Sequence, residues 1–67
     1  MDREDLPFTI EVWSEGFQRL EETLARAGDY LTAKGAFEAA VKRRPGQWLM
    51  VRDRARVVLK YPAGDND

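Results

Sequence analysis

The chain has 67 residues, of which 34% are charged, and a formal net charge of −1 at pH 7. It contains no cysteine and no histidine, which excludes disulfides, all but excludes ordinary zinc and haem sites, and removes the usual general base and thiolate nucleophile of enzymes. We therefore expect one small domain over residues 1–67, with no metal, no cofactor and no enzymatic activity.

Residues 8–13 (FTIEVW) alternate between two sides and are rich in β-branched and aromatic side chains, which predicts a strand. The alternation places Phe8 and Val12 on one side and Trp13 on the other. Ser14-Glu15-Gly16 follows as a turn, because its glycine can adopt a positive φ.

Residues 17–27 carry two competing patterns. Phe17, Leu20 and Leu24 recur at helical spacing among good helix formers. A strand followed at once by a short glycine turn is, however, typical of a hairpin. We favour a second strand that pairs with residues 8–13, and a helix remains the alternative.

Residues 29–44 predict the one clear amphipathic helix. Asp29 is a natural N-cap, the basic residues 42–44 complement the negative end of the helix dipole, and Pro45-Gly46 ends the helix. The middle of its apolar stripe is Phe37, which we expect at the centre of the core. The stripe consists of Tyr30, Ala33, Phe37, Ala40 and Val41.

Residues 47–52 and 56–61 predict a second hairpin, since two short apolar runs flank the charged stretch Asp53-Arg54-Ala55. The expected fold class is α+β: a small antiparallel sheet with one amphipathic helix on one face, in the order ββαββ. If residues 17–27 were helical, the order would instead be βααββ.

The two ends differ in composition from the rest of the chain. A charged start and a turn-forming end predict flexible ends at residues 1–6 and 62–67 around an ordered core of about 8–61. The start has no positive segment followed by an apolar run, and the apolar runs are too short to span a bilayer. We expect a soluble, cytoplasmic protein that does not enter a membrane.

Four stretches distributed along the chain carry a resemblance. They are Leu20-Glu21-Glu22-Thr23-Leu24-Ala25, Ala36-Phe37-Glu38-Ala39-Ala40-Val41, Pro45-Gly46 and Ala55-Arg56-Val57-Val58. Through them, most of residues 8–60 resembles short uncharacterised bacterial proteins. The resemblance implies the same topology, with a strand after Pro-Gly that ends in a basic turn, and it implies no activity. The chain departs from the pattern at Arg52-Asp53-Arg54, where a glycine would be more usual.

Apolar side chains are expected on both faces of the predicted sheet, although one helix can cover only one of them. Residues enriched at protein interfaces, tryptophan and methionine, fall on the face that the helix leaves open. We expect a protein-interaction or self-association module that binds a protein partner or forms a weak homodimer. The expected contact residues are Trp13, Trp48, Met50 and Val58.

Charge is distributed unevenly: residues 1–22 carry a net charge of −5 and residues 42–60 a net charge of +6. A basic C-terminal half with Trp48 and Tyr61 nearby is the basis for an alternative function, weak nucleic-acid binding. A sequence pI of about 5.4 favours instead a solvated helix end and a charged hairpin tip. The candidate nucleic-acid contacts are Lys42, Arg43, Arg44, Arg52, Arg54, Arg56 and Lys60.

Overall fold

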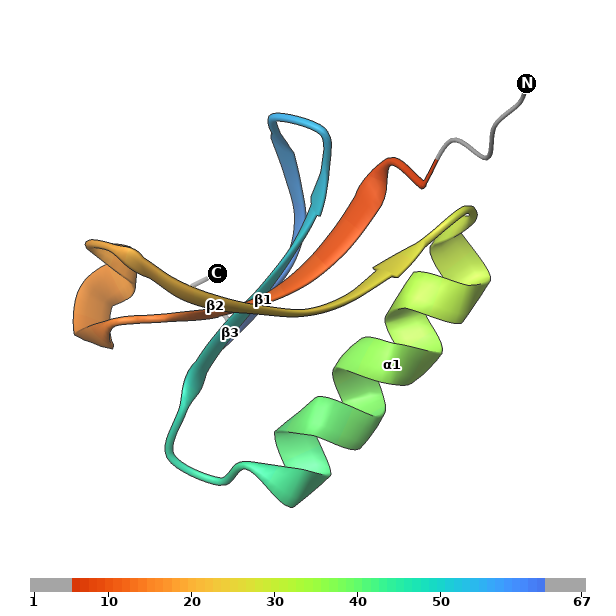
Figure 1. Ribbon diagram of the computed structural model, residues 1–67. Helices are drawn as coiled ribbons and strands as arrows, with labels where there is room; N and C mark the ends of the chain where they lie inside the picture. The colour runs from red at the N-terminus through yellow and green to blue at the C-terminus, as the bar shows by residue number, and fades with distance from the viewer. Residues whose placement is uncertain (1–5, 63–67) are drawn as a thin grey trace.

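The computed structural model describes residues 6–62 and has an α+β fold in the order ββαββ, as the sequence predicted (Figure 1). The expected flexible ends fall, for residues 1–5 and 63–67, outside the described residues. The elements are β1 (Phe8–Trp13), a 3₁₀ turn η1 (Glu15–Phe17), β2 (Leu20–Ala27), α1 (Tyr30–Arg43), β3 (Trp48–Asp53) and β4 (Arg56–Tyr61).

The four strands form one antiparallel sheet in the order β2-β1-β3-β4, so that β1 and β3 are central and β2 and β4 are the edges. Helix α1 lies on one face and contacts β1, β2 and β3 (Figure 1). It leaves the opposite face open, apart from one end, where η1 contacts β3.

Strand β2 settles the competition between helix and strand over residues 17–27. It pairs along its length with β1, from Phe8 opposite Ala27 to Trp13 opposite Leu20. The preceding residues form the 3₁₀ turn, in which Phe17 N donates to the Ser14 carbonyl at 2.8 Å. Pairing with a central strand therefore overrides the local helix propensity, although the strand begins three residues later than residue 17.

Two register shifts in β2 explain why its apolar alternation is irregular. They lie opposite Ile10/Glu11 and Val12/Trp13. Because each shift adds a residue to β2, Leu24 packs against the core, whereas Leu20 comes to lie opposite Trp13 on the other face.

The core lies between α1 and the inner face of the sheet. Ile10, Leu49 and Val51 are fully buried there, beneath a helix surface that includes Ala33 and Phe37. Small alanine side chains let the helix approach the sheet closely, so Phe37 supplies most of the side-chain volume that α1 contributes to the buried core.

The helix ends where the sequence predicted. Asp29 Oδ1 accepts a hydrogen bond from Thr32 N at 2.9 Å, which satisfies a free N–H of the first turn. Ala33, Phe37 and Ala40 of the expected apolar stripe are buried, and Val41 is half-buried. Its first residue, Tyr30, is exposed, and its ring meets that of Phe8 edge-on, at 6.4 Å between centroids.

Replacing Phe37 with alanine should destabilise the domain by about 3–5 kcal/mol, because it removes a buried ring that alanine neighbours cannot replace. A domain of this size has little more stability than that. Thermal and urea unfolding followed by circular dichroism measure the loss. Leu31→Ala, at the most exposed large side chain of the same helix, is the control and should unfold as the wild type does. A Phe37→Ala variant with an unchanged midpoint would show that α1 packs through another face.

Candidate functional site

The face of the sheet opposite α1, called the open face below, is defined by the strand register. Residues directly opposite one another across paired strands share a face. The open face comprises Thr9, Glu11 and Trp13 of β1, Leu20, Thr23 and Arg26 of β2, Trp48, Met50 and Arg52 of β3, and Val57 and Lys60 of β4.

Glu11 lies at the centre of the open face and is 1% exposed. Its Oε1 accepts hydrogen bonds from Trp13 Nε1 at 2.9 Å and from Arg52 Nε at 3.0 Å. Its Oε2 accepts from Thr9 Oγ1 and from Arg52 Nη2, both at 2.8 Å. Arg52 Nε also lies 3.2 Å from Oε2. Each carboxylate oxygen therefore has at least two donors, including one from the Arg52 guanidinium, and the buried group is fully satisfied.

Two opposing effects act on the pKa of Glu11. Burial raises the pKa, since it penalises the charged form. Hydrogen bonds from Arg52, Trp13 and Thr9, together with the positive charge of Arg52, lower it, and their sum outweighs burial. The pKa of Glu11 is therefore below its ordinary value, and the carboxylate is charged at neutral pH.

The pairing with Glu11 also fixes the position of Arg52. The guanidinium uses Nε and Nη2 on the carboxylate and lies over the Trp13 ring, 5.7 Å from its centroid. A guanidinium has five N–H donors in a planar fork. The donors that do not bind Glu11 are consequently held in a defined plane beside Trp13.

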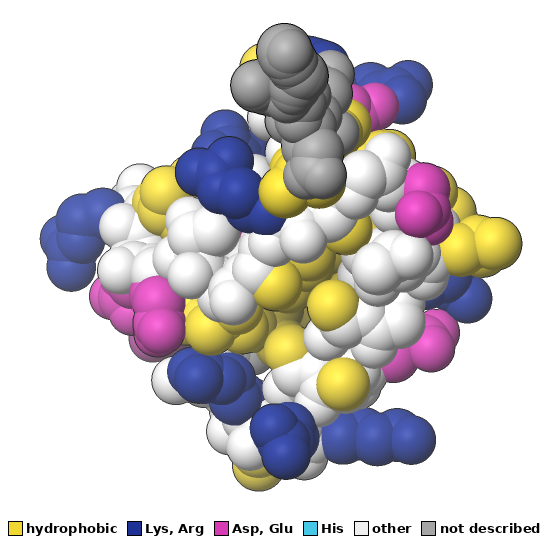
Figure 2. All heavy atoms as spheres, turned by 45° about the vertical axis from the view of Figure 1, so that its right-hand side comes forward, with side chains coloured by type: hydrophobic (Ala, Val, Ile, Leu, Met, Phe, Trp, Pro, Cys, Tyr) yellow, Lys and Arg dark blue, Asp and Glu magenta, His cyan; other side chains and the backbone are white. Residues whose placement is uncertain are grey.

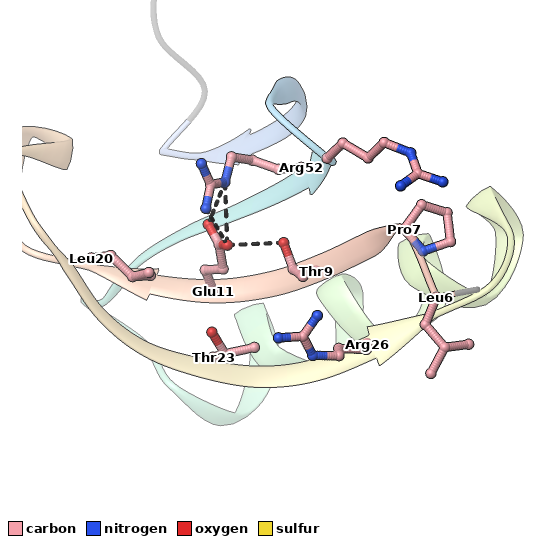
Figure 3. Close-up of a pocket in the computed structure, with 9 residues that line it drawn as sticks. Leu6, Pro7, Thr9, Glu11, Leu20, Thr23, Arg26 and Arg52 are labelled. Atoms are coloured by element: carbon pink, nitrogen blue, oxygen red, sulfur yellow. Dashed lines mark hydrogen bonds and ion pairs between the residues drawn. The ribbon is translucent and has the colours of Figure 1, made fainter. Parts of the chain in front are cut away.

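A hollow of about 610 Å³ opens on the face beside this pair. In Figure 3, Arg52 comes from β3, Glu11 and Thr9 from β1, and Arg26 and Thr23 from β2, while Leu20 lies at the opposite end from Leu6 and Pro7. Without counting Arg54, its lining carries two arginines and one carboxylate, so these groups give the hollow a net positive charge. Its residues are Leu6, Pro7, Thr9, Glu11, Leu20, Thr23, Arg26, Arg52 and Arg54.

Aromatic side chains occupy the other end of the open face. Trp13 lies directly opposite Trp48 in the register, and the Phe17 ring packs edge-on against Trp48 at 4.9 Å between centroids. Lys60 Nζ lies 5.3 Å from the centre of the Phe17 ring. The two tryptophans are half-buried, and Met50, directly opposite Glu11 in the register, is buried.

The contact residues expected from the sequence are only partly brought together. Trp13, Trp48 and Met50 share the open face as predicted, but Val58 does not, because it packs against the core. The cause is a register shift between Val51 and Arg52, which makes Val58 the extra residue of a bulge and places Val57 opposite Arg52 on the open face. Strict alternation cannot reveal such a bulge.

The basic cluster expected for nucleic acid does not gather on one face. Lys42, Arg43 and Arg44 follow the end of α1, whereas the other four lie on the β3–β4 hairpin, whose tip is at the opposite end of the molecule (Figure 1). Figure 2 shows lysine and arginine side chains spread around the outline of the molecule, with acidic groups between them. Ion pairs join Arg44 to Glu22, Arg52 to Glu11 and Arg56 to Asp53.

The turn of this hairpin has an unusual backbone. Arg54 has a φ of 58°, in the left-handed region that glycine favours. It belongs to the stretch Arg52-Asp53-Arg54, where the resemblance made a glycine more usual. Its backbone N–H donates to the Pro7 carbonyl at 2.9 Å, which ties the hairpin to the residue before β1.

Glu11 and Arg26 are not among the site residues that the sequence predicted. A signal for Glu11 was present, since a carboxylate in the middle of an apolar strand requires partners when it is buried. Its partner Arg52 is 41 positions away and can be identified only from the register between β1 and β3. Arg26 carries no comparable signal in the sequence.

Residues 6–62 contain no group of three or more acidic side chains arranged to hold a metal ion. Across that same range, no helix combines the length and the apolar character needed to cross a membrane. No protein-family model, no curated protein and no solved structure matches the chain.

Replacing Glu11 with glutamine should destabilise the fold by about 2 kcal/mol at pH 7, because the amide group places donors against the donors of Arg52 and Thr9. The pKa of Glu11 is lowered by folding, so its charge stabilises the folded state above the ordinary value of 4.5. That contribution is lost as the pH falls through the folded-state pKa.

Urea unfolding at a series of pH values measures this effect. The difference between wild type and Glu11→Gln should shrink as the pH falls below 4.5, and Glu38→Gln on the exposed face of α1 should track the wild type. Taking the difference cancels the contribution of Asp29, whose pKa is also lowered. A difference in unfolding free energy between wild type and Glu11→Gln that stays constant with pH would contradict a lowered pKa for Glu11.

Proposed function

We propose that this chain is a non-enzymatic protein-interaction module that binds a segment of a protein partner across the open face. The observation that carries the proposal is the apolar and aromatic surface of that face, which α1 leaves open and which η1 contacts at one end, where Phe17 packs against Trp48. Leu20, opposite the half-buried Trp13, is 41% exposed, and Val57, opposite Arg52, is 46% exposed. A wet sheet face is ordinarily polar, and aromatic side chains are enriched at interfaces.

The hydrogen bonds around Glu11 support the same function. They hold Arg52 and Trp13 in fixed positions before any partner arrives. A surface whose side chains are already ordered loses less conformational entropy on binding. The same bonds argue against a catalytic role, because a carboxylate with two donors on each oxygen has no free site with which to accept a substrate proton.

The charge of the open face favours a foreign partner over a second copy. Arg26, Arg52 and Lys60 lie on it, and its one carboxylate, Glu11, is buried and paired. Two such faces packed together would bring like charges into contact. Nucleic acid, the other candidate, receives less support, because the basic residues are dispersed and several of them are neutralised by ion pairs.

A selection of peptides from a random displayed library against the folded chain tests this function. Peptides enriched on the wild type should bind the double variant Leu20→Asn, Val57→Asn about tenfold more weakly, because two exposed apolar contacts are lost without a change of charge. Leu31→Asn, at a side chain of α1 that is 77% exposed, is the matched control and should leave binding unchanged. Enriched peptides that bind all three proteins equally would overturn the proposal.

Sedimentation velocity of the same proteins tests whether a second copy of the chain binds the open face. We expect the wild type to sediment as a monomer. A wild-type dimer that the double variant abolishes and Leu31→Asn preserves would overturn the foreign partner in favour of self-association through this face.

A further inference from the structure

The hollow on the open face has an arginine on each of two sides. Arg52 comes from β3 and Arg26 from β2, with the strand β1 between them (Figure 3). Arg26 is exposed, and no ion pair joins it to another residue of the described range 6–62. The positive charge of Arg26 is therefore not neutralised by a neighbour in that part of the chain.

The charge of Arg52 is neutralised by Glu11, but Glu11 does not use all of the N–H donors of Arg52. Glu11 binds Nε and Nη2, which leaves the Nη1 donors and one Nη2 donor of the same rigid group without a place on the carboxylate. Glu11 thus acts as a positioning residue: it sets the plane of the guanidinium of Arg52, which lines the hollow. An arginine held in this way loses little side-chain entropy when it binds an anion.

The rest of the lining sets the chemistry of the ligand. Leu6, Pro7 and Leu20 supply apolar walls, and the Thr23 hydroxyl adds a polar group beside Arg26. A planar group with a single negative charge matches the fork of a guanidinium, and apolar neighbours match the walls. An acidic amino-acid side chain flanked by apolar residues has both properties.

We propose that this hollow binds the carboxylate of an acidic side chain in the partner segment, with Arg26 and the outer donors of Arg52 as its hydrogen-bond donors. The inference rests on the proposed function, because it assigns the chemistry of a partner on the same face. It adds that the partner is acidic and that Arg26 contributes to its recognition.

Titration with two synthetic peptides tests this chemistry. One carries Leu-Glu-Leu between capped alanines, and the other carries Leu-Gln-Leu in the same frame. The readout is the side-chain Nε–H resonances of the arginines and the indole N–H resonance of Trp13, which donates to Glu11. The glutamate peptide should bind at least about tenfold more tightly than the glutamine peptide and should shift the resonances of Arg26 and Arg52.

Arginine variants distinguish binding in the hollow from a general effect of positive charge on the protein surface. Arg26→Gln should weaken the glutamate peptide about tenfold and leave the glutamine peptide unchanged. Arg26→Lys, which keeps the charge and loses the fork, should lie between Arg26→Gln and wild type. Arg43→Gln, the same substitution on the exposed end of α1, should bind as the wild type does.

Three results would overturn the inference. Equal binding of both peptides, or binding that Arg26→Gln does not change, would show that the hollow does not recognise a carboxylate. Inorganic phosphate or an eight-nucleotide oligothymidylate that displaces the glutamate peptide and binds more tightly would assign the hollow to phosphate. These results would leave the proposed function standing if the selected peptides still depend on Leu20 and Val57, because such peptides can bind the open face without carrying an acidic residue.

Discussion

The open face is organised by one buried charge, the carboxylate of Glu11. A charged group with 1% exposure is tolerated only when its hydrogen bonds are complete, and here four donor atoms from three side chains complete them. The requirement acts on the neighbours as well. Arg52 and Trp13 must each hold one orientation for the carboxylate to keep its hydrogen bonds. The cost of leaving the buried Glu11 carboxylate without donors therefore orders the side chains around it.

This order matters because residues 6–62 form one α-helix for a sheet with two faces. Helix α1 covers one face with Phe37 and a set of alanines, and the apolar core is formed there. The other face carries a polar centre between an aromatic end and an arginine-lined hollow. A buried ion pair contributes less to stability than well-packed apolar side chains do, which makes specificity of the surface the better explanation for keeping it. That surface is the basis of both the protein-binding proposal and the carboxylate proposal.

The sequence predicted the order of the elements because each has a local signal: the alternation of residues 8–13, the cap at Asp29 and the stop at Pro45-Gly46. The predicted placement of Val58 on the open face was wrong because a bulge moves it to the core, and a bulge depends on pairing between strands rather than on local pattern. The contact between Glu11 and Arg52 could not be predicted for the same reason, since it depends on the register between β1 and β3. The basic cluster was a property of the linear chain, and the fold separates its two halves.

The most direct test of this account is a pH titration of the Glu11 side-chain carboxyl carbon by NMR, with the indole N–H of Trp13 and the Nε–H of Arg52 followed in the same spectra. The account predicts a titration midpoint below 4.5, with both N–H resonances moving at the same midpoint because they donate to the group that titrates. A midpoint at or above 4.5, with the Trp13 and Arg52 resonances independent of pH, would contradict it.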